Sequence, residues 1–194
     1  MAAPKEWHLT VSSQTFLIST SRTLLNESFI QECFASEEMY WAKATSVQDM
    51  SLMLDNSLTL GLYKLQNPPP SQSPSQSSEK REFIPIGLAR LITDYVTLAY
   101  LTDVFIVPSY RNLGLARWLV DCVKETVMQI PELRRCILLT GTEKLQRMYE
   151  KEMGMSVMQP ERKTQGGEGE GHVLVAMGAT KEDMRNAGKG TRGE

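Results

Sequence analysis

The sequence predicts an α/β fold built around one compact core. The chain has 194 residues, of which 41% are hydrophobic, so it is long enough for one core and short for two. Apolar runs typical of strands alternate along the chain with segments whose apolar residues recur at helical spacing. The clearest transition is residues 103–120, where a strand pattern, a polar turn and an amphipathic helix pattern follow one another. We expect a single domain over residues 1–178 and a polar, flexible tail over 179–194.

The N-terminal half combines strand patterns, two helix patterns and a long loop. The strand patterns cover residues 7–11 and 15–19, which form a first strand region, and then 57–64. The helix patterns cover 26–35 and 47–55. Residues 66–82 are rich in Pro, Ser and Gln and cannot bury enough apolar surface to offset their ordering entropy. We therefore expect a disordered loop between two strands there.

The C-terminal half continues the alternation of strands and helices. Strands are expected at 83–92 and 98–107, joined as a hairpin across residues 93–95, and then at 135–140, 155–158 and 172–177. One helix follows Gly114 and ends before Pro131, and another covers 144–151. Residues 160–171 are rich in glycine and charged side chains, and we expect a flexible hairpin loop there.

Charge and composition argue against several classes of function. The formal net charge of −2 and the absence of a basic run disfavour nucleic-acid and anionic-membrane partners. The three cysteines (Cys33, Cys122 and Cys136) lack metal-ligand spacing, and His8 and His172 lie far apart, so we expect no metal. With no signal peptide and no apolar run of about 18 residues, the chain is expected to be soluble and cytoplasmic, with the nucleus not excluded.

The turn at residues 111–116 has the features of an anion cradle. A helix N-terminus leaves its first N–H groups without intrahelical partners and carries partial positive charge, so backbone alone can bind a phosphate there. Gly114 removes a side chain where the approach is tightest. The other interpretation is that Gly114 relieves strain in a turn that binds nothing. The sequence contains neither a P-loop nor a dinucleotide-binding glycine motif.

Two motifs resemble the signatures of the GNAT superfamily of acetyl-CoA-dependent N-acetyltransferases. Arg111, Gly114 and Ala116 occupy the fixed positions of the pattern Arg/Gln-x-x-Gly-x-Gly/Ala after a strand. Residues 147–155 are similar to the second signature, in which Tyr-Glu-Lys on a helix is followed by Gly, although one extra residue separates the tyrosine from Gly154 here. The resemblance extends from the first strand to about residue 177.

The resemblance implies a mixed central sheet of six to seven strands, splayed at the cofactor site and flanked by about four helices. It implies transfer of an acetyl group from coenzyme A to a primary amine by direct attack in a ternary complex. The residues that it assigns to acetyl-CoA are Phe105, Ile106, Val107, Arg111, Asn112, Leu113, Gly114, Leu115, Ala116 and Arg117. For Arg117 and Lys124, a solvated surface charge is the alternative to a phosphate contact.

Two residues are candidates for the catalytic groups. Tyr149 matches the family tyrosine that donates a proton to the leaving thiolate, and a phenol with a pKa near 10 is protonated at neutral pH. The extra residue before Gly154 would rotate Tyr149 by about 100° unless the helix end absorbs it; we favour absorption, with a core tyrosine bonded to a backbone carbonyl as the alternative. Asp103 shares a strand face with Phe105 and Val107 and is the candidate base.

The acceptor site is expected to involve Tyr40, Trp41 and Asp94. Tyr40 and Trp41 would form an aromatic wall, with core packing as an equal alternative, and Asp94 would either contact the acceptor or cap its own turn. Glu37 and Glu38 would attract a cationic amine or form an exposed helix end. The acceptor is expected to be a small-molecule amine or a peptide lysine, and the protein a monomer or homodimer. The alternative function is a non-catalytic acyl-CoA-binding sensor or interaction module.

Overall fold

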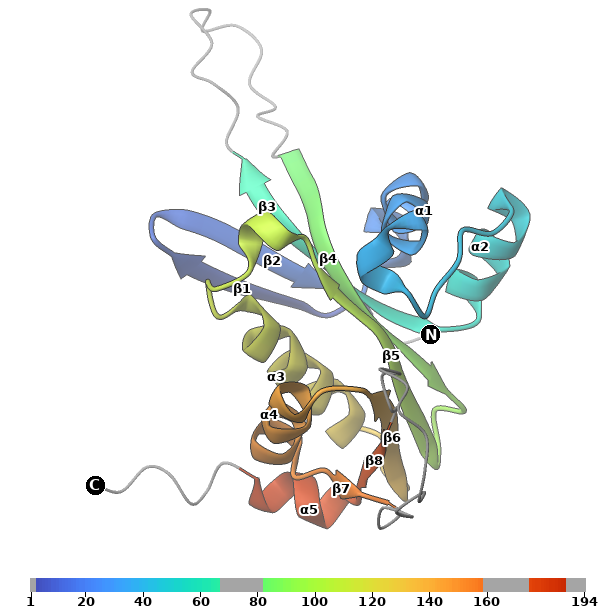
Figure 1. Cartoon of the computed structure of the whole chain (residues 1–194), viewed down its shortest axis with the longest axis vertical. Helices are drawn as coiled ribbons and strands as arrows, with labels where there is room; N and C mark the ends of the chain where they lie inside the picture. Colours follow the sequence, from blue (N-terminus) through green and yellow to red (C-terminus); the bar gives the residue numbers. More distant parts are fainter. Residues whose placement is uncertain (1–2, 67–81, 159–174, 188–194) are drawn as a thin grey trace, which may run out of the picture. The chain divides into compact units, whose positions relative to one another are not determined.

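The computed structural model describes residues 3–66, 82–158 and 175–187. Its strands are β1 (Glu6–Val11), β2 (Gln14–Ser19), β3 (Leu58–Gln66), β4 (Glu82–Thr93), β5 (Leu98–Ile106), β6 (Arg135–Thr140), β7 (Ser156–Val157) and β8 (Val175–Ala179). Its α-helices are α1 (Glu27–Ala35), α2 (Val47–Asp55), α3 (Leu115–Met128), α4 (Glu143–Met153) and α5 (Lys181–Asn186), drawn in Figure 1. Single 3-10 turns cover Arg22–Leu24, Glu37–Met39 and Pro108–Tyr110.

The α/β class is confirmed, and the described strands form one mixed sheet. Their hydrogen-bonded order is β1-β2-β3-β4-β5-β6-β8-β7. The pair β5 and β6 is parallel, whereas β1 with β2, β2 with β3, β6 with β8 and β7 with β8 are antiparallel. The predicted number of six to seven strands is too low, because the expected first strand region consists of two separate strands joined by a tight turn at Ser12 and Ser13.

The chain forms two compact units. Unit 1 comprises residues 1–90 and 103–119, and unit 2 comprises residues 91–102 and 120–194. Strands β4 and β5 and helix α3 therefore contribute to both units. A single domain over residues 1–178 stays a prediction.

The core of unit 1 lies between helices α1 and α2 and strands β4 and β5. Both helices begin at side-chain caps: Asn26 accepts a hydrogen bond from the Phe29 amide at 3.0 Å, and Ser46 accepts one from the Asp49 amide at 3.0 Å. Their apolar faces meet the strands in one cluster, composed of Ile30, Cys33, Phe34, Met39, Met50, Leu54, Leu88 and Phe105. Figure 1 shows α1 and α2 side by side. This cluster anchors the end of β5.

Unit 2 buries alternate residues of its strands. Ala99, Leu101, Cys136, Leu138 and Met177 are at most 2% exposed, as the two-residue period of a strand requires. Helix α4 is capped at its start by Thr142, whose side chain accepts from the Leu145 amide, and at its end by Gly154 in a left-handed conformation with φ 65°.

Helix α5 corrects the prediction of a flexible tail over residues 179–194 and raises the predicted number of about four helices to five. Thr180 and Asp183 form a reciprocal capping box at its start, and Met184 is fully buried. The Thr-x-x-Asp pattern was readable in the sequence, but a single apolar residue in a polar segment gave no periodicity. Residues 188–194 lie outside the described part of the chain.

Two other predictions fall mostly outside the described residues. Of the loop expected at 66–82, residues 67–81 are not described, while Gln66 ends β3 and Glu82 begins β4. The loop expected at 160–171 and the first residues of the strand expected at 172–177 are not described either; the described strand β8 begins at Val175.

Candidate active site

The predicted cradle is the turn between β5 and α3. After the 3-10 turn Pro108–Tyr110 the backbone adopts positive φ at Asn112 (72°) and at Gly114 (77°). The first helical hydrogen bond runs from the Trp118 amide to the Gly114 carbonyl at 3.2 Å. The amides that precede Trp118 in the first turn of α3 therefore lack an i−4 helical partner. This arrangement presents backbone donors at the positive end of a helix dipole.

Open space lies above Gly114. A Cβ atom built on Gly114 would meet no atom within 4 Å, so neighbouring packing does not require a glycine there. The positive φ does favour glycine, because L-residues are strained in that region. Space beside a helix N-terminus suits a phosphate group, so the residues present fit the pyrophosphate of an acyl-CoA.

The Arg111 side chain bonds to groups on both β5 and the 3-10 turn Glu37–Met39. Its Nε donates to the Ile106 carbonyl at 2.9 Å, and its guanidinium forms an ion pair with the Glu38 carboxylate. The guanidinium carbon also lies 5.7 Å from the centroid of the Phe105 ring. The Arg111 side chain therefore links the end of β5 to the 3-10 turn Glu37–Met39, whereas its backbone belongs to the cradle.

The end of β5 supplies the predicted pantetheine segment, Phe105 to Val107. The parallel ladder with β6 pairs Leu98–Leu101 with Arg135–Leu138. On the other side the Val107 amide donates to the Ile86 carbonyl of β4 at 2.9 Å. Within unit 1, this bond joins the end of β5 to the neighbouring strand β4. The Ile106 carbonyl, which Arg111 engages, is the one backbone group of this segment for which a side-chain bond is seen in the described residues.

The remaining cradle residues divide between core and solvent. Leu115 is 1% exposed and anchors the start of α3, whereas Asn112, Ala116 and Arg117 are exposed and Leu113 is intermediate. Small or exposed side chains next to the anchored Leu115 leave the backbone of the turn accessible. A contact between Arg117 and a phosphate stays a prediction.

Tyr40 and Trp41 project from the turn that Arg111 holds. Met39 is fully buried in the core of unit 1, but Tyr40 is 56% exposed and Trp41 is 45% exposed. The two rings are perpendicular, with centroids 5.1 Å apart. Of the two interpretations of this pair, exposure favours an aromatic surface over core packing. Glu38, one of the two acids expected to attract an amine, is paired with Arg111.

Asp103 is buried in unit 1 and bonded to two side chains. It is 6% exposed, its Oδ2 accepts from Arg90 Nε at 2.7 Å, and its Oδ1 accepts from Trp41 Nε1 at 3.3 Å. Its φ of 51° interrupts the extended backbone of β5. Sequence reasoning missed Arg90, although an arginine within the apolar run of β4 was a signal, because arginine is rarely buried without a partner.

A model of the acetyltransferase (GNAT) family matches residues 34–155, which include part of the core of unit 1, the cradle and Tyr149. The chain belongs to the GNAT family of acetyltransferases. A protein of Gibberella zeae assigned as an acetyltransferase is 32% identical over 153 residues, which are 78% of this chain and 83% of the relative. GNAT proteins use acetyl-CoA as their acyl donor, which agrees with the fit of the cradle.

Solved structures show the same fold. A Xanthomonas campestris protein assigned to the GNAT family is 26% identical, with a TM-score of 0.50, over 77% of this chain and 88% of that one. The spermidine N-acetyltransferase of Vibrio cholerae, solved with CoA and spermine, has a TM-score of 0.57 over 94% of this chain and 98% of that one. Because that enzyme is 16% identical, its likeness is one of fold.

Tyr149 lies near the end of α4, in unit 2 of this GNAT chain. It is 5% exposed, and burial raises the pKa of its hydroxyl to about 12, with the nearby Cys136 adding to the shift. Helix α4 ends at Met153 and Gly154 caps it, so the extra residue falls in the last helical turn, where absorption was expected. The proton-donor role and its register stay predictions.

The alternative for Tyr149 is a core tyrosine whose hydroxyl bonds to a backbone carbonyl. Tyr63 is a tyrosine of this kind. The Tyr63 hydroxyl donates to the Leu24 carbonyl at 2.9 Å, and burial raises its pKa well above the usual value. For Tyr149, the described residues provide no such carbonyl partner.

Asp94 and Lys124 are engaged within unit 2. Asp94 accepts hydrogen bonds from the Thr97 hydroxyl and from the amides of Val96, Thr97 and Leu98, and these bonds hold its pKa far below the usual value. This is the turn-capping alternative, and an acceptor contact by Asp94 stays a prediction. Lys124 Nζ donates to the carbonyls of Glu152 at 2.9 Å and of Ala187 at 3.3 Å, so it binds the C-terminal ends of α4 and α5.

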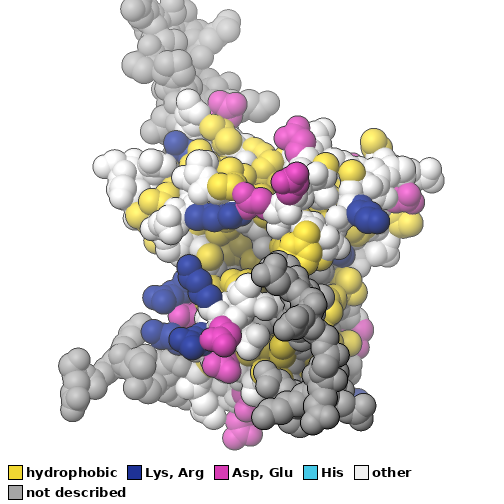
Figure 2. Space-filling model, viewed as in Figure 1, with side chains coloured by type: hydrophobic (Ala, Val, Ile, Leu, Met, Phe, Trp, Pro, Cys, Tyr) yellow, Lys and Arg dark blue, Asp and Glu magenta, His cyan; other side chains and the backbone are white. Residues whose placement is uncertain are grey.

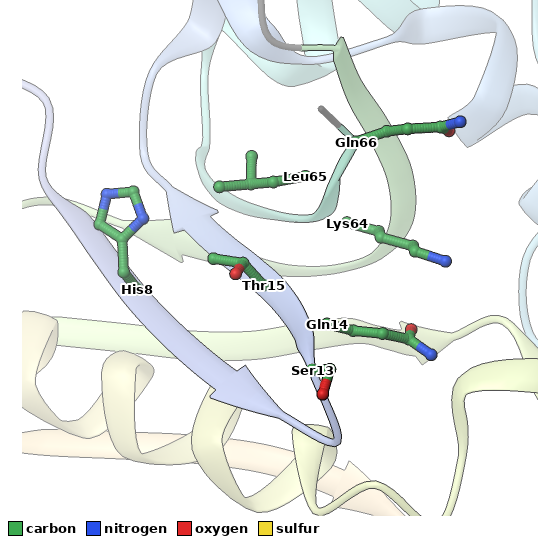
Figure 3. Close-up of a pocket in the computed structure, with 7 residues that line it drawn as sticks. All are labelled: His8, Ser13, Gln14, Thr15, Lys64, Leu65 and Gln66. Atoms are coloured by element: carbon green, nitrogen blue, oxygen red, sulfur yellow. The ribbon is translucent and has the colours of Figure 1, made fainter. Parts of the chain in front are cut away.

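A pocket with a different lining lies where β1, β2 and β3 meet. Its walls are His8, Ser13, Gln14, Thr15, Lys64, Leu65 and Gln66. In Figure 3 the side chains of Lys64 and Gln66 point to one side of the strand and that of Leu65 to the other. None of the predicted site residues lines this pocket.

On the face drawn in Figure 2, acidic and basic side chains are interspersed among hydrophobic ones. Within the described ranges, no group of three or more His, Cys, Asp or Glu side chains is arranged to hold a metal ion, and no described helix has the length and apolar character needed to span a membrane. Burial raises the pKa of Cys33 to about 11 and those of Cys122 and Cys136 to about 12.

Proposed function

We propose that the protein is an N-acetyltransferase that transfers the acetyl group of acetyl-CoA to a primary amine by direct attack in a ternary complex. The observation that carries the proposal is the open, positive-φ turn at Asn112 and Gly114 before α3, within a chain of the GNAT family. Backbone amides of residues 112–116 bind the pyrophosphate, because the Arg111 amide donates to the Pro108 carbonyl at 3.1 Å, and the end of β5 binds the pantetheine arm. Burial-raised pKa values keep the three thiols protonated, which supports direct transfer over an acyl-enzyme.

Tyr149 supplies the proton that the leaving group needs. The amine nitrogen bonds to the carbonyl carbon, the C–S bond breaks with its electron pair on sulfur, and the Tyr149 hydroxyl donates its proton to that thiolate. A pKa of about 12 keeps the phenol protonated at neutral pH. The hydroxyl thus begins each cycle as a donor.

Asp103 receives the amine proton, directly or through a water molecule. Its carboxylate has about four lone-pair sites, and the bonds from Arg90 and Trp41 occupy one on each oxygen. An unaltered pH–rate profile in Asp103→Asn would remove this assignment.

The acceptor is an amine whose cationic or apolar body rests on Tyr40 and Trp41. Exposed aromatic rings bind alkyl groups by burial and ammonium groups through the ring face. The acceptors to be compared are an arylalkylamine, an amino acid, a lysine peptide and a polyamine, the last because the Vibrio cholerae structure is of a spermidine N-acetyltransferase.

Calorimetric titration of acetyl-CoA tests the cofactor site. Saturable binding is expected for the wild-type protein and for Leu52→Trp, which adds an indole at an exposed position of α2. Gly114→Trp places an indole in the open space of the cradle and is expected to abolish binding. A folded wild-type protein that does not bind acetyl-CoA would contradict the proposal.

The alternative function, a non-catalytic acyl-CoA-binding sensor or interaction module, has one observation in its favour. The candidate base is engaged by both Arg90 and Trp41, as a structural residue would be. Thiol release from acetyl-CoA on addition of amines separates the two functions, because a sensor binds acetyl-CoA without releasing thiol.

A further inference from the structure

Arg90 has no part in the chemistry described so far, although it is one of the more buried charged groups of unit 1. Its side chain is 12% exposed, and its Nε donates to Asp103 Oδ2 at 2.7 Å. Removing both charges from water is costly, so a buried ion pair of this kind is weak evidence for stability. A buried pair that contributes little to stability is instead a candidate for fixing one geometry.

The pair reaches an exposed side chain through the second oxygen of Asp103. Oδ1 accepts from Trp41 Nε1 at 3.3 Å, so Arg90, Asp103 and Trp41 form a continuous chain of hydrogen bonds. The chain begins on β4, passes through β5 and ends at an indole that is 45% exposed. With Tyr40 packed edge-on, the Asp103 bond defines how the Trp41 ring is turned.

The backbone of Asp103 adopts a strained conformation, which indicates that its surroundings hold this residue in place. A φ of 51° within a strand is strained for an L-residue, although aspartate and asparagine tolerate it best. Such strain persists where the surroundings hold the residue, and Arg90 and Trp41 are two of the partners that hold this carboxylate. Loss of Arg90 would remove one of the bonds that keep this buried carboxylate turned toward the indole.

We infer that Arg90 is a positioning residue for the acceptor: by holding Asp103 it fixes the orientation of the Trp41 indole. This inference rests on the proposed function, in which Trp41 forms part of the acceptor wall. Arg90 itself touches no reacting atom. Its replacement therefore weakens acceptor recognition and leaves acetyl-CoA binding, which belongs to the 111–116 turn, unchanged.

The orientation of Trp41 can be observed without any activity. The chain has three tryptophans, so protein labelled with 5-fluorotryptophan gives three fluorine resonances, and Trp41→Phe identifies the one from Trp41. Arg90→Met is expected to shift the Trp41 resonance and leave the other two in place, and Arg90→Lys, which keeps a donor, to shift it less. Arg22→Met is the matched control, because it breaks ion pairs with Glu27 and Asp55 in the same unit and is expected to leave all three resonances in place.

Steady-state kinetics supplies the second measurement. In Arg90→Met the acceptor KM is expected to rise about tenfold while the acetyl-CoA Kd stays at the wild-type value. If Arg90→Met does not fold, Arg90→Met combined with Asp103→Asn removes both charges and is expected to restore folding; because Asp103 is the proposed base, this variant is followed by the Trp41 resonance, which is expected to shift, and by the acetyl-CoA Kd, which is expected to stay at the wild-type value.

Two results would overturn the inference. One is a folded Arg90→Met protein whose Trp41 resonance is unmoved, and the other is a shifted resonance with a wild-type acceptor KM. Failure of the proposed function is recognised separately. A wild-type protein that releases no thiol with any amine would refute the proposed function, and the Trp41 resonance would still show whether Arg90 fixes the orientation of the indole.

Discussion

Replacing Gly114 and Gly154 by alanine compares two glycines with similar backbone conformations and opposite surroundings. Both have positive φ, 77° and 65°. An L-residue in the left-handed region costs about 1–2 kcal/mol, and alanine recovers about 0.4–1 kcal/mol by restricting the unfolded chain. At Gly114 a Cβ meets no atom within 4 Å, so the free energy of unfolding falls by on the order of 1 kcal/mol.

At Gly154 the same substitution meets backbone. The new Cβ would lie 2.5 Å from the Asp183 carbonyl oxygen and 2.9 Å from its carbon, so the start of α5 must move. Overpacking of this kind adds about 1–3 kcal/mol to the conformational strain. For a chain of this size each 1 kcal/mol lowers the melting temperature by about 2–4 °C. Gly154→Ala is therefore expected to melt clearly below Gly114→Ala.

Acetyl-CoA affinity is expected to follow the opposite order. The Cβ of Gly114→Ala occupies the space assigned to the pyrophosphate and should weaken binding about tenfold, equivalent to roughly 1.4 kcal/mol. Gly154→Ala, measured below its melting temperature, should bind as the wild-type protein does. The assays are thermal unfolding and calorimetric titration. The reasoning is refuted if Gly114→Ala is the less stable variant or binds acetyl-CoA with wild-type affinity.

Other predictions concern the acid, the helix ends and the thiols. Tyr149→Phe should lower kcat by about 10²–10⁴-fold with unchanged acetyl-CoA affinity, and an equal kcat would remove the proton-donor role of Tyr149. Because the raised pKa of about 12 keeps the Tyr149 phenol protonated below that pH, the wild-type rate should show no loss from this group up to about pH 10. Lys124→Met should lower the free energy of unfolding by about 1–3 kcal/mol, because it leaves two helix-end carbonyls without their cation, and it should not alter acetyl-CoA affinity. Thr180→Ala should cost about 0.5–2 kcal/mol and speed amide exchange in α5; unchanged exchange would contradict the capping role. The three buried thiols should react with a disulfide reagent at pH 8 far more slowly in the native than in the denatured protein, and fast native labelling would contradict their raised pKa values.

The features that sequence alone predicted are those that depend on neighbouring residues in the chain. The strand, turn and helix around Gly114 follow from a local apolar pattern and a local helix start, and the structure has them where they were expected. The end of α4 at Gly154 is local in the same sense. Exposure of Tyr40 and Trp41, by contrast, depended on which neighbour entered the core, and the structure shows that it is Met39.

The features that were missed depend on distant parts of the chain. Arg90 meets Asp103 across 13 residues and Asp103 meets Trp41 across 62, and no local pattern encodes either separation. Lys124 lay on a helix face that sequence reasoning assigned to solvent or phosphate, because its carbonyl partners are 28 and 63 residues away. The Arg111 side chain matched a signature, but its bond to Glu38 required the fold.

The most direct test of the account is thiol release from acetyl-CoA in the presence of the amine panel. The account predicts steady release that depends on both acetyl-CoA and one class of amine, that stops in Gly114→Trp and that continues in Leu52→Trp. Saturable acetyl-CoA binding without thiol release from any of the amines would contradict it and would establish the protein as a non-catalytic acyl-CoA-binding module.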